Sequence, residues 1–157
     1  MKFKTIGYIE SPFKKKDEVP RQFFKSNYKG KIEIFEQYRE ALSDLDGFSY
    51  IYVLYLFHKN KGYRLKIKPF FGYNERGLFS TRYPARPNPI GLSIYQLLGI
   101  EDNILHVKGV DVLSGTPVLD IKPYVDVFDH ISDKNMKRGW LQEYFKNKNK
   151  NEIEFHR

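Results

Sequence analysis

Three closely spaced prolines, Pro84, Pro87 and Pro89, constrain this chain more than any other feature. They lie in the stretch GLFSTRYPARPNPIG at residues 77–91. Each proline fixes φ near −65°, removes a backbone donor and moves the preceding residue out of the helical region. The segment that contains the three prolines therefore cannot be a helix or the interior of a central strand. We expect a short strand at residues 78–81 and then a stiff loop that presents Arg82 and Arg86. This loop is either one wall of a ligand site or a structural crossover.

Composition limits the class of protein. The chain has 157 residues, 41% of them hydrophobic, which suits one domain with a proper core. It has no cysteine, which excludes disulfides, thiolate zinc sites and cysteine nucleophiles. It has no apolar leader and no apolar run long enough to span a bilayer, so we expect a soluble, cytoplasmic protein. The net charge of +8 suggests a polyanionic partner, although charge alone is a weak signal.

Alternating and apolar segments predict a mainly β chain. Residues 48–58, FSYIYVLYLFH, are almost continuously apolar, which is typical of a strand buried on both faces. One or two helical turns are expected at residues 36–45 and a short C-terminal helix at residues 137–146. We expect strands at residues 2–10, 29–35, 48–58, 64–70, 92–100, 104–112 and 118–121. These seven short strands favour a single-domain β-barrel over residues 1–147, followed by a frayed basic tail at residues 148–157.

Several common chemistries lack their sequence signals. No glycine-rich dinucleotide motif, P-loop or nucleophile elbow is present. The four histidines lack metal-ligand spacing, so no metal is expected. His58 lies where an apolar strand ends, either as a half-exposed cap or as a ligand contact. The basic residues that alternate in RLKIKPF, residues 64–70, either face phosphates or protect a sheet edge. The residues alone support a site for a flat, polar or anionic ligand.

Five motifs together carry a resemblance to a known family. IGYIESP, VPRQ, LYLFH, FSTRYPARPNPIGLS and GVDVLSGTPVLDIKPY occur in this order between Ile6 and Tyr124. In this arrangement the chain resembles the TsaA/TrmO family. The resemblance implies a β-barrel and a homodimer. It also implies methylation, dependent on S-adenosylmethionine, of the exocyclic amine of threonylcarbamoyl-adenosine next to the tRNA anticodon. Family members often carry an additional C-terminal domain, so here tRNA binding is expected from the barrel, the terminal helix and a dimer partner.

The resemblance also implies which residues contact the cofactor. These are the PRQ tripeptide, the pair after the apolar strand, the arginine of the proline-rich stretch, the residue after PNPIG, and the SGTP turn. In this sequence they are Pro20, Arg21, Gln22, His58, Lys59, Arg82, Leu92, Ser114, Gly115, Thr116 and Pro117. Ser114 stands where the family pattern has an aspartate.

Methyl transfer from a sulfonium needs no metal and no covalent nucleophile, so positioning the amine is the main task. A hydrogen-bond acceptor for the amine proton would help. By residue type the candidates are Asp111, Asp120 and Tyr124, and the sequence does not choose among them. Arg86 or Lys122 could pair with the threonyl carboxylate of the substrate. The alternatives are a non-catalytic RNA-binding barrel and a methyltransferase for another RNA or a small molecule.

Overall fold

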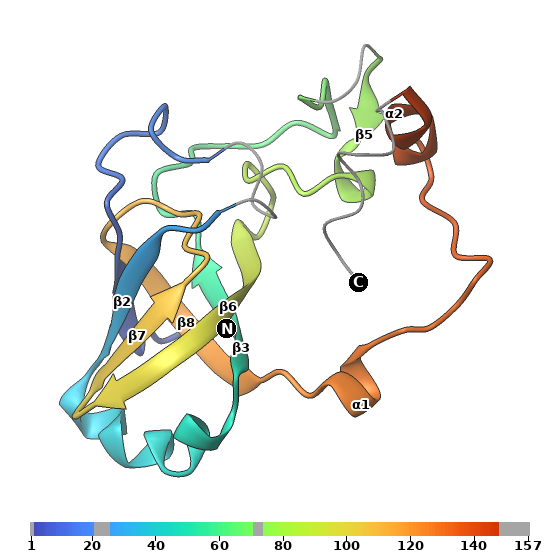
Figure 1. Cartoon of the computed structure of the whole chain (residues 1–157). Helices are drawn as coiled ribbons and strands as arrows, with labels where there is room; N and C mark the ends of the chain where they lie inside the picture. The colour runs from blue at the N-terminus through green and yellow to red at the C-terminus, as the bar shows by residue number, and fades with distance from the viewer. Residues whose placement is uncertain (1, 21–25, 71–73, 148–157) are drawn as a thin grey trace. The chain divides into compact units, whose positions relative to one another are not determined.

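The computed structural model describes residues 2–20, 26–70 and 74–147. Six antiparallel strands close into a barrel in the order β1-β2-β7-β6-β3-β8 (Figure 1). Their bounds are β1 Gly7–Glu10, β2 Lys29–Ile34, β3 Tyr50–Leu56, β6 Ile90–Glu101, β7 Ile104–Lys108 and β8 Thr116–Pro123. The mainly β barrel fold predicted from the sequence is therefore confirmed.

Buried side chains at alternate positions of the strands fill the interior of the barrel. In β3, Ile51, Val53 and Tyr55 are buried and their neighbours in sequence are half-buried or exposed. Successive side chains of a strand point to opposite faces, so one residue in two faces the interior. The interior core consists of Ile9, Ile32, Ile34, Ile51, Val53, Tyr55, Tyr95, Leu97, Leu105, Val107, Val110, Val112 and Val118. Two 3₁₀ helices, η2 (Glu36–Leu42) and η3 (Leu45–Gly47), connect β2 to β3.

Contacts divide the chain into two compact units. The first, Met1–Gly62 with Pro84–His130, contains the barrel and the short helix α1 (Asp126–Asp129). The second, Tyr63–Tyr83 with Ile131–Arg157, contains the hairpin of β4 (Lys66–Ile67) and β5 (Arg76–Gly77), the 3₁₀ helix η4 (Leu78–Ser80) and helix α2 (Leu141–Asn147). The predicted boundary between a domain at residues 1–147 and a tail stays a prediction, and residues 148–157 lie outside the described residues.

The structure corrects five local predictions. The strand predicted at residues 78–81 is instead the 3₁₀ helix η4 (Leu78–Ser80) followed by Thr81, whose Oγ1 hydroxyl donates to the Leu78 carbonyl at 2.7 Å and closes a turn. The strand predicted at residues 48–58 is buried on only one face. Every second side chain points into the barrel, and the apolar side chains between them lie on its outer wall. Residues 2–10 are a strand only from Gly7 onward.

The fourth correction concerns residues 64–70, which pair over only two residues. Pro69 removes a backbone donor just beyond them. The predicted C-terminal helix begins late, at Leu141, because Gly139 has a φ of 54° and interrupts the helical path.

Candidate functional site

Strand direction brings the predicted cofactor loops to one end of the barrel. Strands β1, β3 and β7 finish there, while β2, β6 and β8 begin there, as their antiparallel registers require. The segments that follow Glu10, Leu56 and Lys108 therefore leave the barrel at this end, which we call the site end. The segments that lead into Ile90 and Thr116 enter it at the same end.

Two hydrogen bonds tie three of these loops together. The Phe57 N–H donates to the Pro89 carbonyl at 2.7 Å, which fixes the end of the proline-rich loop beside the end of β3. The Lys16 Nζ donates to the Lys59 carbonyl at 3.1 Å, so the loop that leads to Pro20 reaches the His58–Lys59 pair. The structure thus brings Pro20's loop, His58 and Lys59 together with the loop before β6.

The SGTP turn is held by its own hydrogen bonds. The Ser114 N–H donates to the Phe13 carbonyl and the Gly115 N–H donates to the Ile9 carbonyl, both at 2.8 Å. The Ser114 Oγ accepts a hydrogen bond from the Ser11 N–H at 3.3 Å. Gly115 has a φ of 81°, a conformation that favours glycine. In this chain the Ser114 hydroxyl therefore braces the turn against the loop that follows β1.

Thr116 and Pro117 are the first two residues of strand β8. The Thr116 Oγ1 hydroxyl donates to the Leu113 carbonyl at 2.7 Å, and the side chain is buried. Pro117 pairs with Tyr8 in the β1–β8 ladder. Both residues thus fix the position of the SGTP turn within the barrel wall.

A carboxylate within a polar cluster lies at the site end. Asp111 follows β7, and its Oδ1 accepts hydrogen bonds from the Tyr95 hydroxyl at 2.9 Å and the Ser93 hydroxyl at 3.0 Å. The Tyr55 and Ser93 hydroxyls are 3.0 Å apart. Because Ser93 directs its one proton to Asp111, Tyr55 is the donor to Ser93. The result is a hydrogen-bonded chain from Tyr55 through Ser93 to a carboxylate that Tyr95 also holds.

Burial determines the protonation behaviour of this cluster. Burial raises the pKa of Asp111, while the hydrogen bonds from Tyr95 and Ser93 oppose the rise. Burial and the nearby Asp111 charge raise the pKa of Tyr95 well above its usual range. Tyr95 therefore stays a neutral donor, and Asp111 accepts a proton more readily than an exposed aspartate does.

His58 lies at the end of β3 in a tight turn, where its N–H donates to the Leu56 carbonyl at 2.8 Å. Burial, followed by the charge of Lys59, lowers the pKa of His58 below its usual value of 6.5. The imidazole is therefore neutral at pH 7. A neutral ring suits a site for a sulfonium better than a second cation would.

A glycine permits the close packing beneath this cluster. A Cβ at Gly91 would collide with the Tyr55 ring, whose Cδ2 would lie only 2.8 Å away. The last residue of the PNPIG segment must therefore be small, so that Tyr55 can lie across β6 and reach Ser93. The Tyr55 ring also meets Phe57 edge-on, with 5.3 Å between ring centroids.

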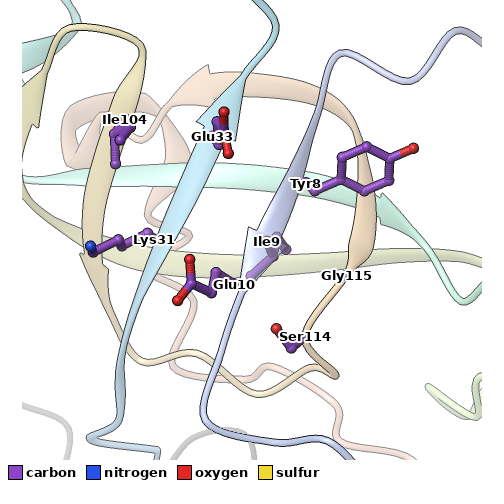
Figure 2. A pocket seen from close by; sticks show the side chains of 8 residues that line it. All are labelled: Tyr8, Ile9, Glu10, Lys31, Glu33, Ile104, Ser114 and Gly115. Atoms are coloured by element: carbon purple, nitrogen blue, oxygen red, sulfur yellow. The ribbon is translucent and has the colours of Figure 1, made fainter.

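A groove of about 210 Å³ crosses the outer wall of the barrel and ends at the SGTP turn. Figure 2 shows Tyr8 and Glu10 of β1, Lys31 and Glu33 of β2 and Ser114 around it. Its volume is below the usual range of about 300–1,000 Å³ for small-molecule sites. The groove alone therefore does not account for a cofactor site.

The other predicted site residues of β8 lie toward the opposite end of the barrel. Asp120 forms an ion pair with Lys122, with Oδ2 and Nζ 2.7 Å apart. Tyr124 stacks edge-on against Tyr50 and Tyr52 beyond the end of the strand. The structure does not bring Asp120, Lys122 or Tyr124 to the site end, whereas Asp111 is there.

Two further predicted contacts lie in β6 and its leading loop. Leu92 pairs with Leu54, and its side chain is 57% exposed on the outer wall of the barrel. Arg86 is half-buried in the proline-rich loop. Their proposed roles toward cofactor and substrate stay predictions.

Comparison with known proteins identifies the family. The sequence profile of the tRNA-methyltransferase O N-terminal domain matches residues 8–130, most of the chain. The chain belongs to this family. A Pyrococcus abyssi protein, described as a probable S-adenosyl-L-methionine-binding protein, is 43% identical over 141 residues, which are 89% of this chain and 76% of that protein.

Longer relatives match over part of their length. The Homo sapiens tRNA (adenine(37)-N6)-methyltransferase is 38% identical over 132 residues, 79% of this chain and 30% of that enzyme. A crystal structure of TrmO from Pseudomonas aeruginosa superposes with a TM-score of 0.71 at 37% identity, covering 89% of this chain and 62% of that one. The chain therefore spans less than two thirds of these two relatives.

The remaining predicted residues of this TrmO-family chain fall outside the assembled loops. Arg21 and Gln22 lie outside the described residues. Arg82 is exposed and belongs to the second unit, so its cofactor contact stays a prediction. Within the described part of the chain, no three His, Asp or Glu side chains gather to form a metal site. Nor is any described helix long and apolar enough to cross a membrane.

Sequence reasoning missed Tyr55, Ser93 and Tyr95 as partners of Asp111. One signal was available: Ser93 and Tyr95 occupy alternate positions of β6 that face inward. Polar side chains at inward positions of a barrel strand require a buried partner.

Proposed function

We propose that this chain is an S-adenosylmethionine-dependent methyltransferase that modifies the exocyclic N6 amine of the adenine next to the tRNA anticodon. The substrate form we propose is threonylcarbamoyl-adenosine. The observation that carries the proposal is the convergence of the loops of Pro20, His58, Pro89 and Ser114 at the end of the barrel that holds the Asp111 carboxylate. Membership of the TrmO family supports it.

The chemistry of the site end fits the proposed cofactor. S-adenosylmethionine supplies an activated methyl group on a positively charged sulfur. Asp111 offers a negative charge, and His58 is neutral at pH 7 because its pKa is lowered. The hydroxyls of Ser93 and Tyr95 keep the carboxylate oriented. Residues on stiff or hydrogen-bonded loops lose little entropy when a ligand is bound.

In this proposal the chain contributes mainly positioning. Holding the amine in line with the donor methyl is worth up to roughly 7–11 kcal/mol. The adenine amine is a weak nucleophile, because its lone pair is delocalised into the ring, and it must lose a proton as the new bond forms. Among Asp111, Asp120 and Tyr124 we assign the acceptor role to Asp111, since it lies at the site end and burial raises its pKa.

We also propose that the protein works as a homodimer in the cytoplasm, where tRNA is available. Exposed apolar side chains on the outer faces of β3 and β6 support a second copy at this wall of the barrel. They are Tyr50, Leu92, Ile94 and Leu98. Light scattering coupled to size exclusion tests this assembly, and a monomeric mass at micromolar concentration would contradict it.

Two measurements test the activity. Calorimetry with S-adenosylmethionine is expected to show saturable binding, and absence of heat at millimolar cofactor would overturn the cofactor assignment. Mass spectrometry of tRNA nucleosides, after incubation with protein and cofactor, is expected to show one added methyl on threonylcarbamoyl-adenosine. Cofactor binding with no methylated nucleoside would overturn the substrate assignment and leave the cofactor assignment intact.

A further inference from the structure

The positive charge of the chain is concentrated in one unit. Residues 63–83 and 131–147 of the second unit carry nine Lys and Arg against three Asp and Glu, a net charge of +6. The first unit is nearly three times as long and carries fifteen against fourteen, a net charge of +1. Most of the overall charge of +8 thus belongs to a small part of the molecule.

Side-chain contacts hold the two segments of this unit together. The Trp140 Nε1 donates to the Ser80 carbonyl at 2.8 Å, which joins the segment before α2 to η4. The Arg76 guanidinium lies 5.7 Å from the centre of the Trp140 ring, a cation–π distance. Ile67 and Leu78 are buried beneath the hairpin. The unit is therefore a defined body, with its own small core, rather than a set of loose basic loops.

Nearly all of these cations face the solvent. Along residues 66–69, Ile67 and Pro69 are buried, while Lys66 and Lys68 are exposed at alternate positions. Arg64, on the other side of a bend at Leu65, is exposed as well. Alternate residues of an extended segment lie about 6.6 Å apart on one side. Arg82, Lys134, Lys137, Arg138 and Lys146 are exposed as well. The unit thus presents Lys66 and Lys68 on one side of an extended segment, Arg64 close to them in sequence, and further cations from both of its segments.

Large aromatic side chains accompany the cations. Phe79 is 77% exposed, Phe70 65% and Tyr63 54%. Exposed rings among cations combine two elements of single-stranded nucleic-acid binding, because unpaired bases stack on rings while phosphates pair with Lys and Arg. A membrane surface would favour a longer amphipathic helix, whereas α2 has seven residues.

We propose that the second unit is the RNA-docking module of this protein, and that it binds the unpaired nucleotides of an RNA loop through Arg64, Lys66, Lys68 and the exposed rings of Phe70 and Phe79. This inference deepens the proposed function, on which it rests for the identity of the polyanion. It narrows the sequence-based expectation, in which the barrel, the terminal helix and a dimer partner together supply tRNA binding. The barrel supplies the cofactor end, and the hairpin unit supplies the affinity for RNA.

Fluorescence anisotropy with the full-length chain and a labelled RNA hairpin with an unpaired loop tests the proposal, with salt as the variable. The variant R64Q/K66Q/K68Q removes three cations of the second unit. Its matched control K4Q/K14Q/K15Q removes three exposed cations of the first. Each phosphate contact in a single strand contributes about 0.7 to the slope of log K against log salt. We expect the slope to fall by about 2 in the first variant and to stay unchanged in the control.

A second variant tests stacking. F70A/F79A is expected to weaken loop binding at least fivefold, given the usual contribution of one stacked base, and to leave binding of a fully paired duplex unchanged. Circular dichroism and size exclusion of each variant check its fold and mass. A change of mass in F70A/F79A, with unchanged RNA binding, would assign the rings to a protein interface and overturn the proposal.

Two other outcomes overturn it. One is an equal loss of RNA binding in the control K4Q/K14Q/K15Q. The other is stronger binding to phosphatidylserine vesicles than to the RNA hairpin at the same salt concentration. Failure of the proposed enzyme activity is distinguishable, because hairpin binding needs no cofactor. RNA binding that depends on the second unit, without methyl transfer, would retain this inference and reject the activity.

Discussion

Replacement of Asp111 by asparagine separates the charge of this side chain from its shape. The substitution keeps an oxygen that can accept from Tyr95, and the Ser93 hydroxyl, 3.0 and 3.2 Å from the two carboxylate oxygens, can accept from the new amide. The geometry of the cluster is therefore expected to survive. What is lost is the negative charge at the site end, and with it the proposed acceptor for the amine proton.

The effect of Asp111→Asn on stability follows from two opposing contributions. Hydrogen bonds to a charged group stabilise by about 1.5–3 kcal/mol and neutral ones by about 0.5–1.5, so weakening two of them costs about 2 kcal/mol. Against this, burial raises the pKa of Asp111 from its ordinary value of 3.8, and burial is the larger effect. A raised pKa stabilises the fold below the unfolded-state value, and this contribution is lost as pH rises through the folded-state value.

At pH 7 the ionised carboxylate therefore destabilises the fold, and asparagine removes that penalty. We expect the free energy of unfolding of Asp111→Asn, measured with urea at pH 7, to be equal to or higher than that of the unchanged chain. We expect methyl transfer in single-turnover assays to fall by about 10²- to 10⁴-fold, the usual range for loss of an acid–base group. Asp102→Asn, in the exposed turn between β6 and β7, is the matched control. It breaks an exposed ion pair with Arg39, so it should change the free energy of unfolding by at most about 1 kcal/mol and leave methyl transfer unchanged.

Two results would refute this reasoning. A clear loss of stability in Asp111→Asn would mean that the carboxylate is a structural brace whose hydrogen bonds outweigh its burial. Full methyl transfer by Asp111→Asn, with loss of transfer in Asp120→Asn, would move the acceptor role to Asp120. The latter change breaks only the partly exposed ion pair with Lys122, which is worth at most about 1 kcal/mol.

Three further predictions address packing and protonation. Gly91→Ala should lower the free energy of unfolding by about 1–3 kcal/mol in urea titrations, because the added methyl group overlaps the Tyr55 ring; unchanged stability would show that the ring moves freely. Trp140→Phe removes the hydrogen bond to Ser80 and should speed amide exchange in the second unit while exchange in the barrel stays unchanged; faster exchange throughout would argue against separate units. The His58 ring should titrate below 6.5 in NMR spectra, because burial disfavours its cation, and a midpoint above 6.5 would contradict a neutral site.

Prediction from the sequence succeeded where local chemistry decides. The barrel strands β2, β3, β6 and β8 match their predicted ranges to about two residues at each end, because alternation of apolar side chains is a local property. Strand β7 begins where predicted, at Ile104, and ends four residues early, at Lys108. The helical turns expected at residues 36–45 are found as the 3₁₀ helix η2, Glu36–Leu42. Prediction failed at residues 78–81, where short-range hydrogen bonds from Ser80 and Thr81 override an apolar pattern.

The sequence identified candidate residues of the site but not which of them lie together. The sequence marked Asp111, Asp120 and Tyr124 as equivalent acceptors, because each is the right residue type near the end of the motif region. Only closure of the barrel separates them. Asp111 meets β6 through Ser93 and Tyr95, while Asp120 pairs with its neighbour Lys122 farther along β8.

By itself the sequence determined the alternation that makes a barrel, the stiffness of the loop with Pro84, Pro87 and Pro89, and the family to which the motifs belong. Tertiary structure decided which loops meet, because strands close in the order β1-β2-β7-β6-β3-β8, which chain order does not give. It also decided that residues 63–83 join residues 131–147 and gather the positive charge in one unit. Contacts such as that of Ser11 with Val112 link residues far apart in the chain, and they form only when the whole barrel has closed.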